Sequence, residues 1–165
     1  MDFQNRTVLI TGAAGNLGRA VAEAFAQRGA NLVLVDLKLD ALEKVFGAGD
    51  PQRLLAPTNL LEQAQVDATA QKAIDRFKRI DVLANLAGGF RMGDPVHETS
   101  DATWKFLLDI NANTLLHAVR AVVPRMLAQG GGKIVNVGAF AAQKGAAQMG
   151  AYVAEIGRAS CRERV

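Results

Sequence analysis

Three glycines near the amino terminus have the spacing of a phosphate-binding turn. In the segment TGAAGNLG they are Gly12, Gly15 and Gly18, and they follow a short apolar run and precede a stretch of helical period. Glycine lets the backbone turn sharply and approach a pyrophosphate, whose charge then lies against the N-terminus of the following helix. The pattern predicts a site for the phosphates of a dinucleotide.

A carboxylate follows at the distance that a dinucleotide site requires. Asp36 comes directly after the apolar run NLVLV (31–35), eighteen residues after Gly18. At the end of a second strand, such a carboxylate accepts hydrogen bonds from the hydroxyls of an adenosine ribose and repels a 2′-phosphate. Leu37 beside it supplies no positive charge. We therefore expect NAD rather than NADP, and the alternative is that Asp36 is an ordinary residue at a strand end.

These residues must be carried by elements that alternate along the chain. Short apolar runs predict strands at 7–10, 31–35, 53–56, 81–85 and 133–137. Helical period is seen after the glycine turn, where Leu17, Val21 and Phe25 recur every four residues, and at 38–46, 60–79 and 100–126. Strands that are apolar on successive residues are typical of a parallel sheet covered on both faces. The alternation predicts an α/β fold, a doubly wound Rossmann-type parallel sheet with strand order 3-2-1-4-5.

Composition excludes several other functions. The 165 residues carry a net charge of only +3, and no basic stretch is interleaved with aromatics, so we expect no nucleic-acid partner. With Cys161 as the only cysteine and two histidines, we expect no metal site. No run of eighteen apolar residues occurs and the N-terminus lacks the pattern of a signal peptide, so we expect a cytoplasmic protein that binds no membrane.

Five motifs resemble the short-chain dehydrogenase/reductase family in both order and spacing. They are TGAAGNLG (11–18), Asp36, NLAG (85–88), Asn111 in a long helix, and Tyr152 after KIVNVGA (133–139). The resemblance covers residues 5–154, the N-terminal two-thirds of the family's fold. It implies an NAD(P)-dependent oxidoreductase that acts on a small carbonyl or alcohol substrate and whose full-length form is a homo-oligomer.

By position, the resemblance also implies which residues hold the cofactor. They are Gly12, Gly15, Asn16, Leu17 and Gly18 around the diphosphate, Asp36 at the ribose, Asn59 and Leu60 beside the adenine, and Asn85, Ala87 and Gly88 behind the cofactor's ribose. The family usually has Asp where this chain has Asn59, and Asn where it has Leu86. The glycine spacing also fits the family's extended, epimerase-like branch, whereas NLAG favours the simple reductase branch.

The resemblance assigns the chemistry to a second group of residues. In the family, a tyrosine gives the carbonyl a proton while hydride moves, and a lysine four residues later lowers the pKa of that tyrosine. A serine polarises the carbonyl, and a helix asparagine holds a water that relays protons. Tyr152 and Asn111 match the tyrosine and the asparagine. The serine position is Ala139 and the lysine position is Ile156.

The missing serine has a parallel within the family. The stretch VGAFAAQKGAAQMGAYVA (137–154) resembles the corresponding part of dihydropteridine reductases, which work with tyrosine and lysine alone. Asn111 departs from that subgroup and matches the general reductases. The substrate is therefore open between these two groups.

The last eleven residues, 155–165, differ from the rest of the chain. They have no apolar stripe, contain the only cysteine and include three arginines among the final eight residues. They resemble the translation of a common sequencing-library adapter. We therefore expect residues 1–154 to form a Rossmann domain that is truncated after its fifth strand, residues 155–165 to be non-native, and the fragment to be inactive. The alternative from another class is a non-catalytic NAD-binding sensor that kept the nucleotide site and lost the serine and the lysine.

Overall fold

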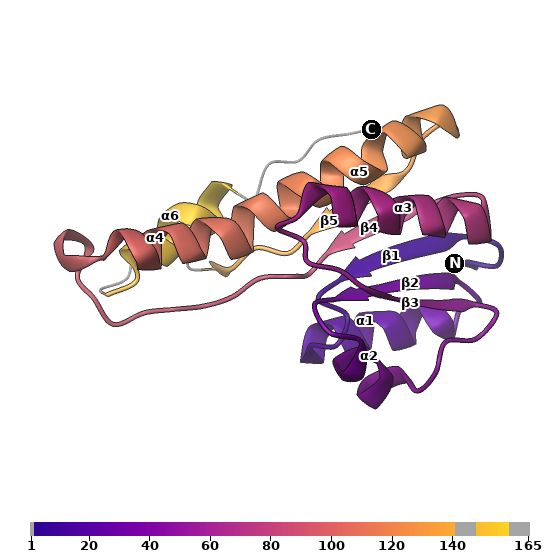
Figure 1. The fold of residues 1–165 in the computed structure, drawn as a ribbon, viewed down its shortest axis with the longest axis horizontal. Helices are drawn as coiled ribbons and strands as arrows, with labels where there is room; N and C mark the ends of the chain where they lie inside the picture. The colour runs from indigo at the N-terminus through magenta and orange to yellow at the C-terminus, as the bar shows by residue number, and fades with distance from the viewer. Residues whose placement is uncertain (1, 141–147, 159–165) are drawn as a thin grey trace.

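A parallel sheet of five strands forms the centre of the molecule (Figure 1). The structure is a computed structural model that describes residues 2–140 and 148–158, with side chains described as far as Ala154 in the second range. The strand order is β3-β2-β1-β4-β5. The strands are β1 (Thr7–Thr11), β2 (Asn31–Asp36), β3 (Arg53–Pro57), β4 (Val82–Asn85) and β5 (Lys133–Asn136). The predicted strand order is confirmed.

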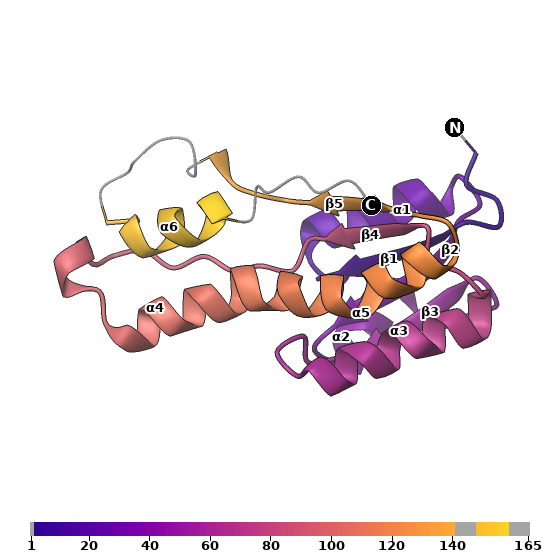
Figure 2. The ribbon, with the colours of Figure 1, turned by 90° about the horizontal axis from the view of Figure 1, so that it is seen from above.

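Helices cover both faces of the sheet, as expected for a doubly wound fold. On one face lie α1 (Asn16–Ala26) and α2 (Leu39–Phe46), and on the other lie α3 (Gln63–Phe77) and α5 (Thr114–Ala128). The short helix η1 (Val96–Glu98) precedes α4 (Asp101–Leu108), which continues through the π-helical turn η2 (Asp109–Asn113) into α5. Figure 2 shows α4 and α6 (Gly150–Arg158) extending beyond the carboxyl ends of the strands, where they contact each other.

The continuous apolar runs of the sequence are explained by burial on both faces of the central strands. All five residues of β1 are buried. Val8 and Ile10 belong to the core under α1 and α2, whereas Leu9 belongs to the core under α3 and α5. In α1, Val21 and Phe25 of the predicted stripe pack against the core under α1 and α2 beside the buried Ala22, whereas Leu17 keeps half of its surface exposed.

The strand β5 differs from the other four. Its residues alternate between exposed and half-buried, and Val135 is 50% exposed while Ile134 packs against the core. It pairs with β4 through the register Asn85↔Asn136, and in residues 2–140 and 148–158 it has no partner on its outer side. The expected boundary between residues 154 and 155 lies inside α6, and residues 159–165 lie outside the described part of the chain.

The long helical run Asp101–Ala128 has the length and apolar composition of a membrane-crossing segment. Core helices of soluble proteins have the same properties. In this fold Ala118, Val122 and Met126 are buried in the core formed with α3 and the sheet. The run therefore gives only weak evidence of a membrane span.

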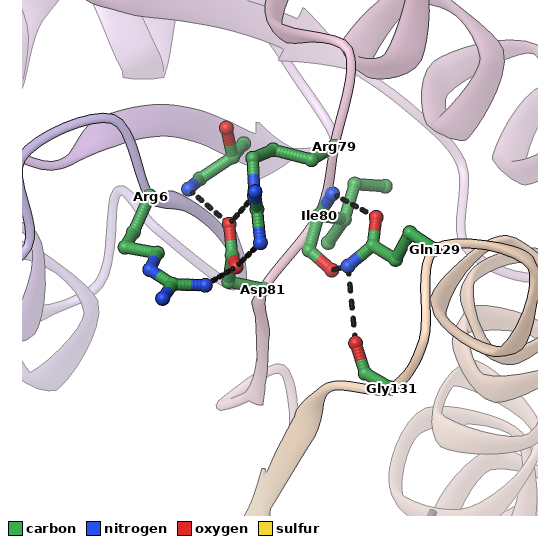
Figure 3. Close-up of polar contacts among 7 residues, drawn as sticks. Arg6, Arg79, Ile80, Asp81, Gln129 and Gly131 are labelled. Atoms are coloured by element: carbon green, nitrogen blue, oxygen red, sulfur yellow. Dashed lines mark hydrogen bonds and ion pairs between the residues drawn. The ribbon is translucent and has the colours of Figure 1, made fainter.

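At the edge of the sheet where the parallel strands begin, the carboxylate of Asp81 is paired with two arginines (Figure 3). Arg6 donates to Oδ1 at 2.7 Å, while Arg79 Nε and the Thr7 amide donate to Oδ2 at 2.7 Å and 2.9 Å. Burial of Asp81 opposes its ionisation, but the hydrogen bonds from Arg79, Thr7 and Arg6 outweigh it, so its pKa lies below the usual value. These bonds tie the start of β1 to the start of β4.

Gln129, just beyond α5, makes a second cross-link at this edge (Figure 3). Its Oε1 accepts from the Ile80 amide at 3.1 Å, and its Nε2 donates to the Ile80 carbonyl at 2.7 Å and to the Gly131 carbonyl at 3.1 Å. The amide thereby fixes the end of α5 against the residues that enter β4. We regard this edge as structural, since its polar side chains are used to hold the strands in place.

Candidate dinucleotide site and adjoining cleft

The turn between β1 and α1 depends on two of its glycines. Gly12 has φ +66, in the left-handed region, and a Cβ there would lie 2.9 Å from the backbone of Ala87. A Cβ on Gly18 would overlap the Gly12 carbonyl oxygen and lie 2.7 Å from the Ala13 Cα. Glycine at both positions therefore lets the start of α1 pack against the turn and the turn pack against the loop after β4.

Asp36 lies beside this turn at the carboxyl end of β2. Its Oδ2 accepts a hydrogen bond from the Ala14 amide at 2.9 Å, and its Oδ1 accepts one from the Leu37 amide at 2.8 Å. The Ala13 amide donates to the Val35 carbonyl at 3.0 Å. The turn and the acid, 22 residues apart in the chain, are thus in direct contact.

A cleft of about 420 Å³ runs along the carboxyl ends of the first three strands. Seven of the residues expected at the cofactor line it: Gly12, Gly15, Asp36, Asn59, Leu60, Ala87 and Gly88. The sequence did not single out eight further lining residues, which are Leu37, Thr58, Leu61, Leu86, Phe106, Asp109, Ile110 and Thr114. A pattern within one segment does not identify the last four, because α4, η2 and α5 reach the cleft only through the tertiary fold.

The four other expected cofactor residues lie around this cleft without lining it. Asn16 and Leu17 are exposed in the first turn of α1, and Gly18 is buried between that helix and the glycine turn. Asn85 is buried, and its Nδ2 donates to Asn136 Oδ1 at 2.9 Å on the neighbouring strand. A contact between any of these four and a cofactor stays a prediction.

The loop that carries Asn59 and Leu60 is held from two helices. The Asn59 amide donates to Gln65 Oε1 at 2.9 Å, and Asn59 Oδ1 accepts from the Leu61 amide at 3.1 Å. His117 Nδ1 lies 2.8 Å from the Leu60 carbonyl oxygen. His117 therefore fixes one wall of the cleft, a role that no sequence motif indicated.

Thr11, the last residue of β1, joins the first strand to the loop after β4. It is buried, and its Oγ1 accepts from the Leu86 amide at 3.1 Å and from the Ala87 amide at 3.2 Å. The loop that separates the large cleft from a neighbouring one is thereby fixed relative to the glycine turn.

That neighbouring cleft, of about 340 Å³, contains the residues expected to do chemistry. Asn111, Ala139 and Tyr152 all line it, together with Phe90. Leu86, Ala87 and Gly88 line both clefts, so the two adjoin along this loop. The fold brings together residues from the loop after β4, from η2, from the segment after β5 and from α6, which are far apart in the chain.

Both polar atoms of the Asn111 side chain form hydrogen bonds with the backbone of one residue, Gly89. It is buried in the π-helical turn η2, where its Oδ1 accepts from the Gly89 amide at 2.9 Å and its Nδ2 donates to the Gly89 carbonyl at 3.1 Å. π-Helical turns inside α-helices are frequent at functional sites. The side chain holds the loop after β4, and a role in proton relay stays a prediction.

Tyr152 is the titratable side chain of the smaller cleft. Its ring packs edge-to-face on Phe90 with centroids 4.7 Å apart, and burial raises the pKa of its hydroxyl above 10.0. Ala139 offers no hydroxyl, and no lysine or arginine is found among the described residues that line this cleft. Ile156 lies one helical turn after Tyr152 in α6, and its side chain is outside the described part.

A metal centre is not evident in the part of the chain that the structure describes. There, no group of three or more His, Cys, Asp or Glu residues lies close enough to hold a metal ion. The two clefts therefore offer backbone amides, the Asp36 carboxylate, apolar walls and the Tyr152 hydroxyl to a bound molecule.

Comparison by sequence matches residues 6–155 to the short chain dehydrogenase family model. Sorbitol dehydrogenase of Cereibacter sphaeroides is 34% identical over 155 residues, which cover 93% of this chain and 60% of the relative. Cyclohexanol dehydrogenase of an Acinetobacter species is 31% identical over 155 residues, covering 92% of this chain and 62% of the relative. The chain thus spans about 60% of the length of these curated relatives.

Solved structures agree with the sequence comparison. NAD⁺-bound xylitol dehydrogenase superposes with a TM-score of 0.88 and 30% identity, covering 95% of this chain and 62% of that one. 7α-Hydroxysteroid dehydrogenase complexed with NADH and 7-oxo glycochenodeoxycholic acid gives a TM-score of 0.87 and 27% identity, with coverage of 96% and 63%. Both proteins carry a nicotinamide cofactor in these structures.

Proposed function

The chain belongs to the short-chain dehydrogenase family, and we propose that it derives from an NAD-dependent oxidoreductase acting on a small alcohol or carbonyl compound. The observation that carries the proposal is the contact between the glycine turn and the acid of β2. Ala14 N and Asp36 Oδ2 are 2.9 Å apart, and both segments line one cleft. That is the arrangement that one adenosine diphosphate requires, with phosphate at the turn and ribose at the acid.

The proposed site assigns each part of the dinucleotide to residues of the large cleft. The diphosphate would lie against the glycine turn and the start of α1, where backbone amides favour negative charge. Asp36 would accept from the ribose hydroxyls, and the apolar side chains of Leu37 and Leu60 would contact the adenine. The nicotinamide would then lie toward the smaller cleft, along the loop that both clefts share.

The charge of the large cleft supports NAD over NADP. A 2′-phosphate beside Asp36 would face a carboxylate, and no lysine or arginine belongs to the described lining of this cleft. A positively charged side chain within a few ångströms would be needed to hold such a phosphate. The relatives bound to NAD⁺ and NADH are consistent with this preference.

In the smaller cleft, the Tyr152 hydroxyl can donate a proton, but the described lining residues include no cation that would favour its loss. The bound cofactor supplies a hydride acceptor or donor. Tyr152 carries the exchangeable proton, and because burial raises the pKa of its hydroxyl, the group stays protonated at neutral pH. Ala139 cannot polarise a carbonyl, and Ile156 brings no positive charge to the Tyr152 phenolate. We therefore propose that this chain binds NAD but turns over substrate very slowly or not at all.

A fluorescence titration of the 165-residue chain with NADH and with NADPH tests the cofactor assignment. We expect NADH to bind at least about tenfold more tightly, since a factor of ten corresponds to about 1.4 kcal/mol, the size of one unfavourable charge contact near a surface. NADPH binding as tightly as NADH, or more tightly, would contradict it. NADH oxidation should be absent with the ketones derived from sorbitol, xylitol or cyclohexanol.

A second candidate function is that of a non-catalytic NAD-binding sensor, and a third is a dihydropteridine reductase-like activity. Ala139 favours both, because neither needs a hydroxyl that polarises a carbonyl. Adding a quinonoid dihydropteridine to the assay separates them. Turnover of that compound alone would favour the third candidate, whereas NADH binding without turnover of that compound would contradict it.

A further inference from the structure

Asp36 makes a contact that its proposed role at the ribose does not require. Its two carboxylate oxygens accept hydrogen bonds from backbone amides, Oδ2 from Ala14 at 2.9 Å and Oδ1 from Leu37 at 2.8 Å. Ala14 is a central residue of the glycine turn, whereas Leu37 is the next residue along the chain. One carboxylate therefore links the turn to the end of β2.

Few other polar contacts hold the turn in this shape. Within it, the Gly15 amide donates to the Gly12 carbonyl at 3.2 Å, and the Ala13 amide donates to the Val35 carbonyl at 3.0 Å. The Asp36–Ala14 bond involves a charged acceptor, and such bonds are about twice as strong as those between neutral groups. It is therefore a major constraint on where the turn lies relative to β2.

The two roles of the carboxylate are chemically compatible. An ionised carboxylate offers about four lone-pair sites, and the two backbone amides occupy only two of them. The others remain for hydroxyl groups of a ribose in the cleft that Asp36 lines. An asparagine at this position would lose that capacity, because its amide nitrogen would face one of the two backbone N–H donors.

We propose that Asp36 is also a positioning residue for the diphosphate-binding turn, so that one carboxylate sets both the choice of cofactor and the affinity for its phosphates. The second half of this inference, the effect on the affinity for the cofactor's phosphates, rests on the proposed function. The first half, the positioning of the turn by Asp36, stands on the contacts alone. Substituting Asp36 should then weaken the binding of both nicotinamide cofactors.

The first test is amide hydrogen exchange by NMR in the ligand-free 165-residue chain. In Asp36→Asn and Asp36→Ala we expect the amides of Ala13 and Ala14 to exchange at least about tenfold faster, because a charge-assisted hydrogen bond is lost. The buried amide of Val33 should not change. Asp40→Asn is the matched control, since it removes the same charge from an exposed residue whose carboxylate, within the described part of the chain, accepts only from the neighbouring Ala41 amide.

Each outcome of this test is informative. Faster exchange at Ala14 alone would mean that Asp36 covers one amide without positioning the turn, and would overturn the proposal. Equal acceleration at Val33 would indicate a general loss of stability and would overturn it as well. Faster exchange at Ala13 and Ala14 in a chain that binds no NADH would support the positioning role while contradicting the proposed function.

The second test compares cofactor binding by Asp36→Asn and by Asp40→Asn. If Asp36 acted only through charge and the ribose, its neutralisation would weaken NADH and tighten NADPH. A positioning role predicts that NADH binding weakens at least about tenfold and that NADPH binding does not tighten, because the turn serves the phosphates of both. Tighter NADPH binding by Asp36→Asn would contradict the proposal.

Discussion

The two adjoining clefts are built in different ways. In the large cleft, the turn after β1, the end of β2 and the loop after β3 are joined by hydrogen bonds from the Ala14 amide to the Asp36 carboxylate and from the Thr58 amide to the Asp36 carbonyl. In the smaller cleft, Tyr152 faces the Phe90 ring and lies near Ala139, with a pKa that burial raises. The first cleft contains most of the residues proposed to bind the cofactor, whereas the second has Ala139 and Ile156 at the positions where the family has serine and lysine.

This difference follows from where the contributing segments lie in the chain. Most polar groups of the large cleft come from residues 11–60, within consecutive strand–helix units. The smaller cleft is assembled from the loop after β4, from η2, from the residues after β5 and from α6. We therefore predict that substitutions outside the shared loop at residues 86–88 change the properties of one cleft and leave those of the other largely unchanged.

The largest expected effect comes from Gly18→Ala, which alters the large cleft. The added Cβ would overlap the Gly12 carbonyl oxygen, so either the turn or the start of α1 must move. We expect a loss of about 3 kcal/mol in the free energy of unfolding, measured by urea denaturation, and a loss of NADH binding.

Gly138→Ala is the matched control for Gly18→Ala. Among the described residues, no atom lies within 4 Å of a Cβ at Gly138, which lines the smaller cleft. The free energy of unfolding should change by less than about 0.5 kcal/mol. Equal losses in the two variants would show that the close packing of the turn does not matter for stability.

A smaller effect is expected from Ile156→Lys, which would add the missing cation to the smaller cleft. A lysine one helical turn from Tyr152 should lower the pKa of that hydroxyl, because an ammonium group about 4 Å from a phenolate stabilises it by about 1 kcal/mol even in water. Tyr152 is the only tyrosine of the chain, so the phenolate absorbance reports on it directly.

Ile156→Met separates charge from shape in this experiment, since methionine is unbranched but neutral. Its titration should match that of the original chain, and NADH binding should be the same in all three proteins. A Tyr152 pKa that does not differ between the lysine and methionine variants would indicate that residue 156 is not next to the hydroxyl.

The smallest effect is expected from Tyr152→Phe, and it appears only at high pH. Burial raises the pKa of Tyr152 above its value in the unfolded chain. The folded protein therefore keeps a proton that the unfolded chain has already lost, so this group's contribution to stability is intact below about pH 10 and is lost as pH rises through the folded pKa. Urea denaturation at pH 9 and pH 11 should show a smaller decrease in Tyr152→Phe than in the original chain, by less than about 1 kcal/mol. Parallel decreases would contradict the expected shift.

Local patterns predicted much of the fold and part of the candidate site. Five apolar runs gave the strands in their observed order, and the spacing of Gly12, Gly18 and Asp36 predicted a turn and an acid that the fold places in contact. The same reasoning did not identify which predicted residues line the cleft. Leu17 is exposed and Asn85 is buried against Asn136, although both belong to motifs that matched.

The sequence alone determined the alternation of strands and helices, the place of a glycine-rich turn before the first helix, and the types of residue available for chemistry. These depend on periodicity, on steric limits of the backbone and on residue identity, which are local properties. Only the tertiary structure decided that the Ala14 amide donates to Asp36 and that Tyr152 lies against Phe90. It also decided that both polar atoms of the Asn111 side chain bond to the backbone of Gly89. Hydrogen bonds and burial depend on which distant segments meet, and that is set by the packing of the whole sheet and its helices.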